Sequence, residues 1–422
     1  MSLQFIEGGA GTGKTTTAIE RLAQLLVTSP LTEHQRVLAL TKMHGSRRRM
    51  RDRLQCVAAI NGRFESATID SFAWRIVRRW RSLARVLGDI ALPTEYDAIC
   101  ALAGQLLENQ CVQKWVASSF PIVVIDELQD SKGGQLRVLK GLCTECACIA
   151  AGDPFQDLEG DQSCLSVDWA RRQCTPTLLE IPHRTSNAGL LDAATSIRNS
   201  RPVKTSGGFA LKGVKAAPLG AWEVACKIDK WRKLGTVAVI TPVGPRSTFV
   251  RTIVDRVNRE PPLGKKWRVG PFLLPWEVAQ DEQVEAVCRE IGLKSDSEDR
   301  IRAQDLVLNG DGRVGRVRAW ISRQRRLLGR HEFSAAELRS VVKEVVHQGR
   351  MYINNEERGL VAMTIHQAKN REFDRVIVLW PYEVSGDIER KRRLAYNAIT
   401  RARHDAFVLV QGEERVNECP FV

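Results

Sequence analysis

The sequence predicts an α/β protein whose parallel sheets are flanked by helices, and three observations lead to this fold class. A glycine-rich loop at residues 8–15 joins an apolar segment of strand length, 3–6, to a segment of helical periodicity, 15–26. Further apolar segments of strand length alternate with helical ones, and several end in polar residues, as parallel strands do at ligand sites. A second unit with this alternation begins at strand 237–241 and continues in helix 247–259.

The loop reads Gly-Gly-Ala-Gly-Thr-Gly-Lys-Thr, with four residues between its first glycine and Gly-Lys-Thr, which is the phosphate-binding pattern. Its glycines let N–H groups point at phosphate oxygens, and the following helix presents its positive end to the same anion. Lys14 would reach the outer phosphates, and the Thr15 hydroxyl would enter a Mg²⁺ shell. Such a pattern arises by chance in roughly one chain of this length in a hundred. We therefore expect the nucleotide to contact Gly8, Gly9, Ala10, Gly11, Thr12, Gly13, Lys14, Thr15 and Thr16.

A second part of an ATPase site follows the apolar strand 121–125, which runs directly into Asp126 and Glu127. An aspartate at a strand end holds Mg²⁺, often through water, and the neighbouring glutamate orients or deprotonates the attacking water. A further strand, 148–151, ends in Gly-Asp-Pro-Phe-Gln at residues 152–156. The other expected elements are strands at 36–41, 359–364, 375–379 and 406–410, a strand followed by a turn at 64–72, and helices at 46–60, 73–118 and 394–403.

Composition narrows the class of protein. The 422 residues suit two to four domains, and no apolar run approaches the ~18 residues needed to span a bilayer. The phosphate loop begins at Gly8, so we expect no removable leader peptide and a cytoplasmic protein. A formal charge of +14 favours polyanion partners, although any single basic cluster could equally be a solvated face.

Eleven cysteines raise the alternative of a zinc site, mainly at Cys143, Cys146 and Cys148. These three lie beside an apolar segment, and no second pair has zinc-site spacing. We expect most of the cysteines to be reduced and buried.

Taken in order, the motifs resemble those of superfamily 1 DNA helicases of the UvrD/Rep/PcrA type over nearly the whole chain. The matching segments are 8–15, 41–54, 68–72, 126–131, 152–156, 183–185, 363–374 and 394–402. The resemblance implies two RecA-like cores, with ATP and Mg²⁺ between them and single-stranded DNA across their top. It places core 1A at 1–75 and 118–178, core 2A at 179–259 and 358–422, and short accessory insertions at 76–117 and 260–357.

The resemblance also implies roles for individual residues. Gln156 would sense the γ-phosphate, and Arg184 and Arg401 would act as arginine fingers. His183 would stack on adenine, Glu372 would bind the ribose, and Thr15 and Asp126 would hold the metal. The DNA contacts implied are Thr41, Lys42, His44, Arg47, Thr68, Ser71, Thr364 and His366.

Four positions depart from the family pattern. His183 replaces a tyrosine, Lys42 an aromatic residue, Asp70 a histidine and Asn370 a glycine. Aromatic platforms for bases are worth about 1–3 kcal/mol per base, so we expect greater reliance on phosphate contacts.

The expected function is an ATP-driven translocase or helicase on single-stranded DNA, which by resemblance moves 3′ to 5′ and could engage duplex junctions. The main alternative is a non-processive, DNA-sensing regulatory ATPase that works with a nuclease or another protein subunit, as in a bacterial phage-defence system. A third alternative, an RNA-directed remodeller, is compatible with the basic charge alone.

Overall fold

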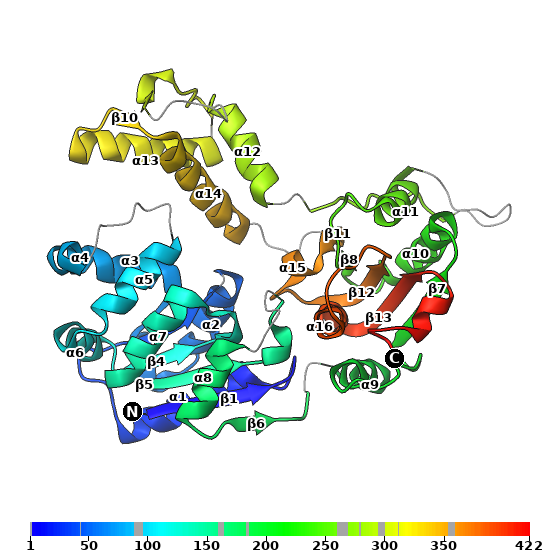
Figure 1. Cartoon of the computed structure of the whole chain (residues 1–422), viewed down its shortest axis with the longest axis horizontal. Coiled ribbons are helices and arrows are strands. Elements are labelled where there is room, and N and C mark those ends of the chain that lie inside the picture. The colour runs from blue at the N-terminus through cyan, green and yellow to red at the C-terminus, as the bar shows by residue number, and fades with distance from the viewer. Residues whose placement is uncertain are drawn as a thin grey trace.

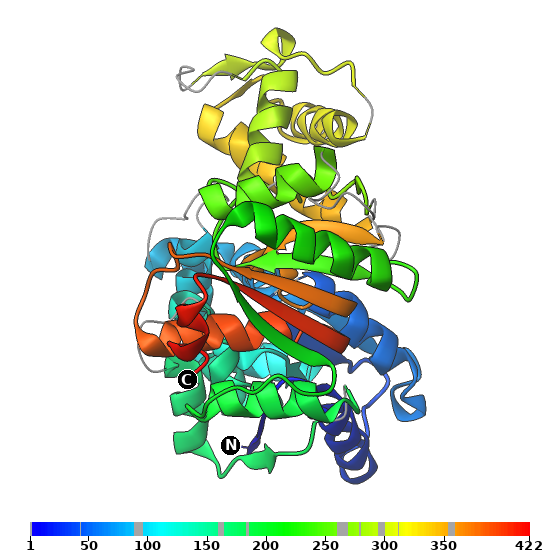
Figure 2. The ribbon, with the colours of Figure 1, turned by 90° about the vertical axis from the view of Figure 1, so that its right-hand side faces the viewer.

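The computed structural model describes residues 2–42, 44–87, 96–158, 164–182, 185–259, 269–277, 280–293, 300–310, 312–352 and 359–422. Two large parallel sheets with their helices lie side by side, and a third, mostly helical lobe lies above them (Figures 1 and 2). The predicted fold class is confirmed, because each large sheet is parallel throughout and has helices packed on both faces.

The first sheet has six strands in the order β3-β2-β4-β5-β1-β6. Its strands are β1 (Ser2–Gly8), β2 (Val37–Thr41), β3 (Phe64–Thr68), β4 (Ile122–Ile125), β5 (Ala147–Gly152) and β6 (Thr177–Leu179). Because β5 lies between β1 and β4, three loops meet at one edge: the loops that follow the carboxyl ends of these strands. The phosphate loop follows β1, the Asp-Glu pair follows β4, and the Gly-Asp-Pro-Phe-Gln segment ends β5.

Helices cover both faces of this sheet, which is why its central strands are apolar throughout. One face carries α1 (Lys14–Thr28) and α2 (His44–Gln55). The other carries α3 (Ile69–Arg79), α4 (Arg81–Leu87), α5 (Tyr96–Leu106), α6 (Gln110–Ser119), α7 (Gly133–Glu145) and α8 (Leu165–Gln173). Helices α4 to α6 contribute to the same hydrophobic cluster as β4 and β5, so the described residues of this segment, 76–87 and 96–117, share the core of the first sheet.

The second sheet has five strands in the order β11-β8-β12-β13-β7. They are β7 (Phe209–Val214), β8 (Val237–Thr241), β11 (Leu360–Thr364), β12 (Phe373–Trp380) and β13 (Ala402–Gln411). One face packs on α9 (Ala188–Arg198), α15 (Ile365–Ala368) and α16 (Ile388–Ile399). The other face packs on α10 (Ala217–Trp231) and α11 (Thr248–Arg259).

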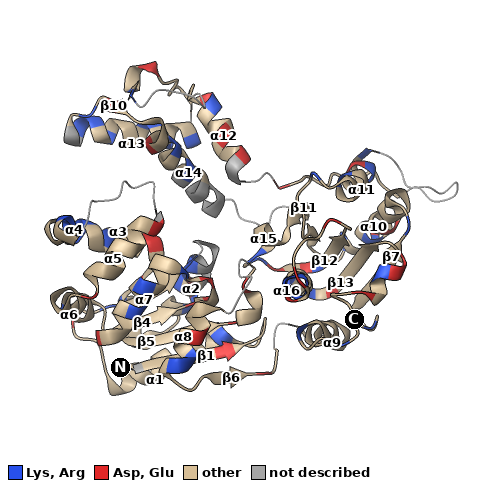
Figure 3. Ribbon diagram, in the orientation of Figure 1, with Lys and Arg blue, Asp and Glu red and all other residues tan. Residues whose placement is uncertain are grey.

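The third lobe lies within the segment 260–357 and has its own hydrophobic cluster. It contains α12 (Gln280–Glu290), α13 (Arg313–Leu328), α14 (Ala335–Tyr352) and the short pair β9 (Ile301–Arg302) and β10 (Glu332–Phe333). Figure 3 marks several Lys or Arg positions along the ribbon of α13, whose sequence from Arg313 to Leu328 contains six arginines. The chain on the amino side of this lobe pairs with the edge strand β11, where the Ala362 N–H donates to Pro275 O at 2.9 Å.

Several element boundaries differ from those expected. The segment 64–72 was expected to be a strand and a turn; the strand ends at Thr68, and the residues after it begin α3 rather than a turn, because the Thr68 side chain accepts from the Ser71 N–H. The last helix ends at Ile399 rather than at 403, since β13 already begins at Ala402. Strands β6 and β7 and helices α7, α8, α9 and α10 were not predicted.

All eleven cysteines are free thiols. Cys143, Cys146 and Cys148 are buried where α7 meets β5, and burial raises the pKa of Cys146 to about 12. Over the described part of the chain, no group of three or more His, Cys, Asp or Glu side chains is arranged to hold a metal ion. Among the same residues, no helix combines the length and the apolar character needed to cross a membrane.

Candidate active site

The phosphate loop has the backbone geometry that its glycines permit. Gly11 and Gly13 have φ values of 76° and 86°, in the left-handed region, and Gly13 precedes the first turn of α1. The Lys14 ammonium donates to Gly8 O at 2.9 Å and to Gly9 O at 2.8 Å. These bonds hold the ammonium against the loop, on the side where the loop would receive phosphates.

Glu127 is fixed in the site by an unpredicted residue, Gln129. Glu127 follows the end of β4 and has a left-handed φ of 55°. The Gln129 side chain donates to Glu127 Oε2 at 2.6 Å, and its oxygen accepts from the Asp153 N–H at 2.9 Å. One buried amide therefore sets the position of the Glu127 carboxylate relative to the end of β5.

The electrostatic surroundings keep Glu127 ionised. Burial alone raises its pKa, but Lys14, Lys369, the hydrogen bond from Gln129 and Arg401 outweigh burial and hold the pKa below its ordinary value. Lys14 comes from the first sheet, whereas Lys369 and Arg401 come from the second. Cations from both halves of the molecule thus converge on one carboxylate.

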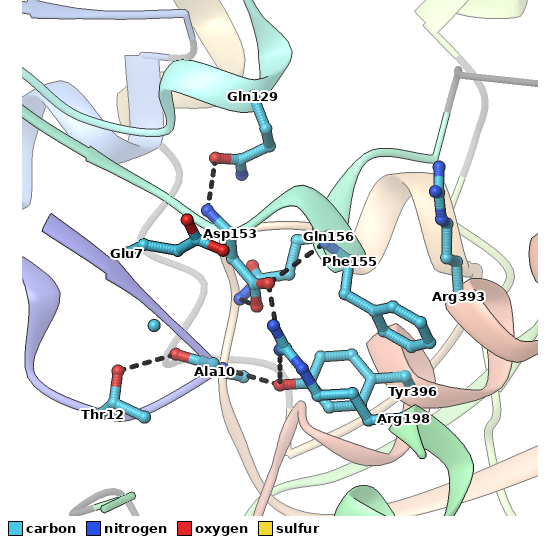
Figure 4. A network of polar contacts seen from close by, with 12 residues as sticks. Glu7, Ala10, Thr12, Gln129, Asp153, Phe155, Gln156, Arg198, Arg393 and Tyr396 are labelled. Carbon is cyan, nitrogen blue, oxygen red and sulfur yellow. Dashed lines mark hydrogen bonds and ion pairs between the residues drawn. The ribbon is translucent and has the colours of Figure 1, made fainter. Parts of the chain in front are cut away.

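The segment after β5 presents Gln156 to the same cleft. Asp153 is fully buried and accepts from the Phe155 N–H at 3.1 Å and from Gln156 Nε2 at 3.0 Å (Figure 4). The side chain of Phe155 packs into the hydrophobic cluster of the second sheet and meets the Tyr396 ring edge-on, with centroids 5.1 Å apart. This segment therefore follows a strand of the first sheet in the chain, but its Phe155 side chain packs against the second sheet.

The second sheet contributes Arg401 and Lys369. Arg401 is 4% exposed and is held by Asn397 O at 3.0 Å from its Nε. Lys369 Nζ lies 2.5 Å from Asp130 Oδ1 and 3.3 Å from Gln156 O. Of the predicted catalytic residues, the structure brings Lys14, Glu127 and Arg401 into one electrostatic neighbourhood, with Gln156 linked to it through Lys369.

Other predicted nucleotide contacts have different placements. His183 and Arg184 lie outside the described residues. Glu372 pairs with Arg403 at 3.3 Å, and the next residue, Phe373, donates its N–H to Arg401 O at 2.9 Å. Glu372 therefore lies close to Arg401 in the folded protein.

Three of the eight predicted DNA-contacting residues, Thr41, Thr68 and Thr364, are the last residues of strands, two in the first sheet and one in the second. Thr68 ends the edge strand β3 and caps α3 by accepting from the Ser71 N–H at 3.2 Å. Thr364 ends the edge strand β11 and caps α15 by accepting from the Gln367 N–H at 3.2 Å. The two sheets therefore carry the same capping arrangement at the same place in each.

The remaining members of this set follow these strand ends. Thr41 is buried at the end of β2, Lys42 and Arg47 are partly exposed after it, and His366 is exposed in α15. The side chain of His44 lies outside the described residues. Asn370, at the position of the family glycine, has a left-handed φ of 62°, which asparagine tolerates better than most residues.

Sequence reasoning missed five residues that shape the site. Four of them lie inside segments that resemble the family motifs, and this membership was the one signal in the sequence that could have indicated them: Gln129, Asp153, Lys369 and Tyr396. Arg198 stands at the end of α9 and in no motif, and nothing in the sequence distinguishes it from other surface arginines.

Comparison with known protein families gives two matches. A family described as an AAA domain matches residues 1–160, and a family described as a UvrD-like helicase C-terminal domain matches residues 359–409. No curated protein matches the chain. The first match covers the phosphate loop, Glu127 and Gln156, and the second covers Lys369 and Arg401.

Proposed function

The chain belongs to the UvrD-like helicase family and is an ATP-hydrolysing helicase, and we propose that it translocates 3′ to 5′ along single-stranded DNA. The observation that carries this proposal is the convergence on Glu127 of Lys14 from the first sheet with Lys369 and Arg401 from the second. Hydrolysis at such a site depends on how the two sheets sit relative to each other, which is what a motor requires.

Each side chain has a distinct task in the proposed reaction. Lys14 neutralises the outer phosphates, and Glu127 orients the attacking water and accepts its proton. Arg401 stabilises the charge that develops on the transferred phosphoryl group, and Arg184 is expected to be a second arginine with the same role. Gln156 contacts the terminal phosphate, and His183 and Glu372 hold the adenine and ribose.

The donors fit a Mg²⁺ ion. The Thr15 hydroxyl and the Asp126 carboxylate offer the oxygen ligands that Mg²⁺ prefers, and both side chains are partly exposed at the same sheet edge. A bound Mg²⁺ would neutralise phosphate charge and orient the phosphates. Asp126 is carried there by its position directly after β4, where its N–H donates to Leu40 O at 3.0 Å.

Single-stranded DNA would cross the carboxyl ends of both sheets. Thr68 and Thr364 already cap a helix in each sheet, so the hydroxyls at these sites have fixed positions for a sugar–phosphate backbone. Lys42 and Arg47 follow β2, the neighbour of β3 in the sheet, and His366 lies two residues after Thr364; all three side chains are exposed or partly exposed.

One observation favours the regulatory alternative. Residues 76–87 and 96–117, the part of this insertion that the structure describes, pack into the core of the first sheet rather than into a cluster of their own, so they offer little extra surface for gripping a duplex. A chain with this reduction could sense DNA and signal to a nuclease subunit, as in phage defence, without unwinding a duplex by itself.

Measurements of ATP hydrolysis, ATP binding and strand displacement test the proposed function. Glu127→Gln should abolish turnover with ATP binding nearly intact, whereas Lys14→Ala should lose both. Stimulation of hydrolysis by single-stranded DNA but not by RNA supports a DNA motor, and near-normal turnover by Glu127→Gln would refute the site. Strand displacement by the isolated chain separates the helicase from the regulatory ATPase.

A further inference from the structure

Arg198 joins the two sheets at the phosphate loop, although no motif contains it. It is the last residue of α9, and its Nη1 lies 3.0 Å from Asp153 Oδ1 and 3.4 Å from the Tyr396 hydroxyl (Figure 4). The Tyr396 hydroxyl in turn accepts from the Ala10 N–H of the phosphate loop at 2.8 Å. The Arg198 guanidinium thus contacts the segment after β5 directly and is linked to the phosphate loop through the Tyr396 hydroxyl.

The surroundings of Arg198 restrict its position. Its side chain is 30% exposed, and its guanidinium lies over the rings of Phe155 and Tyr396, 5.4 Å and 5.7 Å from their centroids. Asp153 is 0% exposed, so its carboxylate is shielded from water and its pairing with Arg198 is stronger than a surface ion pair. Burial lowers the pKa of Arg198, but the charge of Asp153 and the contacts with Tyr396 together outweigh burial and raise this pKa.

Asp153 connects this arginine to the residue expected to sense the terminal phosphate. Its Oδ1 accepts from Arg198 Nη1 and from the Phe155 N–H, while its Oδ2 accepts from Gln156 Nε2 at 3.0 Å. The Arg198 side chain therefore fixes one oxygen of the carboxylate whose other oxygen holds Gln156. Rotation of that carboxylate would move the Gln156 amide.

We propose that Arg198 is a positioning residue that makes the placement of Gln156 depend on the second sheet. The inference rests on the proposed function, in which Gln156 contacts the terminal phosphate. When the sheets are together, Arg198 holds Asp153, and Asp153 holds Gln156. When they separate, Asp153 loses this partner and Gln156 loses its fixed orientation. The terminal phosphate is then sensed only in the closed arrangement.

The proposal predicts a specific kinetic pattern for Arg198→Ala. Its kcat for ATP under saturating single-stranded DNA should fall at least about tenfold, because the reacting phosphate loses an oriented contact. Its affinity for ADP, which lacks the terminal phosphate, should stay within about twofold of wild type. Arg198→Lys keeps a cation beside Asp153, so its kcat should be at least about threefold higher than that of Arg198→Ala. Arg201→Ala, an exposed arginine three residues further along, serves as the matched control and should behave as wild type.

A double-mutant cycle tests the route through Asp153. Asp153→Asn should itself lower kcat, and adding Arg198→Ala in that background should lower kcat by less than about threefold further.

Equal losses of ADP affinity and kcat in Arg198→Ala, with no recovery in Arg198→Lys, would indicate a merely structural role and overturn the proposal. An unchanged or increased rate in Arg198→Ala would also overturn it. A wild-type chain that shows no DNA-stimulated hydrolysis would instead refute the proposed function, and the two failures are therefore distinct.

Discussion

Lys369 Nζ lies 2.5 Å from Asp130 Oδ1, and this ion pair joins the two sheets beside the catalytic carboxylate. Both side chains are nearly buried, with 11% and 4% of their surfaces exposed. Burial raises the pKa of Asp130 to about 6; Lys369 opposes this rise and the nearby Glu127 adds to it. Because the folded pKa exceeds the ordinary 3.8, the stability contributed by this carboxyl is present at low pH and is lost as pH rises through 6. The ion pair with Lys369 has the opposite dependence and forms above pH 6.

The rate of hydrolysis should therefore have an acid limb that belongs to Asp130. Between pH 7 and pH 5 the wild-type kcat should fall by up to about tenfold as Asp130 takes up a proton and Lys369 loses its partner. Asp130→Asn should show a low rate without an inflection near pH 6, measured by steady-state kinetics over this range. An inflection that persists unchanged in Asp130→Asn would assign it to another group.

Gln129 should matter for catalysis and little for nucleotide binding. Removing a hydrogen bond to a charged group costs about 1.5–3 kcal/mol, so Gln129→Ala should lower kcat by roughly 10- to 100-fold. The affinity for ADP should change by less than about threefold, since Gln129 touches Glu127 and the Asp153 N–H rather than the phosphate loop. A loss of ADP affinity as large as the loss of kcat would contradict this account of Gln129.

The strength of DNA binding should depend steeply on salt. Lys42 stands where the family has an aromatic residue, and Arg47 lies partly exposed on α2 beside two further arginines. Binding through phosphates gives a log–log salt slope of about −0.7 per contact on single strands. Replacing Arg47, Arg48 and Arg49 by alanine should flatten that slope by up to about two units, as measured with a fluorescent oligonucleotide at several salt concentrations. An unchanged slope would mean that the triplet is a solvated helix face and would move the assignment to α13.

Asn370 should be sensitive to alanine and tolerant of glycine. Its φ of 62° lies in the left-handed region, where most L-residues are strained by roughly 1–2 kcal/mol. Asn370→Ala should lower the free energy of unfolding by about 1 kcal/mol, and Asn370→Gly should be close to neutral in denaturant titrations. Equal destabilisation by both changes would show that the asparagine side chain, not the backbone angle, matters here.

The predictable part of the fold consists of elements with strong local patterns. Strands 121–125 and 237–241 are continuous apolar segments because helices cover both faces of their sheets, and such segments are visible in the sequence. Strand β7 was missed because it lies at a sheet edge, with Phe209 and Val214 buried and the residues between them partly or fully exposed. Strand β6 has three residues, none fully buried.

The same distinction applies to the site. Lys14 and Glu127 are recognisable because their chemistry requires fixed neighbours in the chain. Arg198 could not be found that way, since its partner Asp153 is 45 residues away and on the other sheet. Contacts of this kind depend on how two folded units pack together, and no local spacing records that packing.

The central claim is that one ATP site is shared between the two sheets, and the steady-state rate of ATP hydrolysis by Arg401→Ala with saturating single-stranded DNA tests it most directly. Arg401 comes from the second sheet and helps to hold down the pKa of Glu127 on the first. Removing a charge-stabilising arginine of this kind typically costs 10³ or more in kcat. We predict a fall of at least about tenfold in kcat with nucleotide affinity little changed. Normal DNA-stimulated hydrolysis by Arg401→Ala would contradict a shared site.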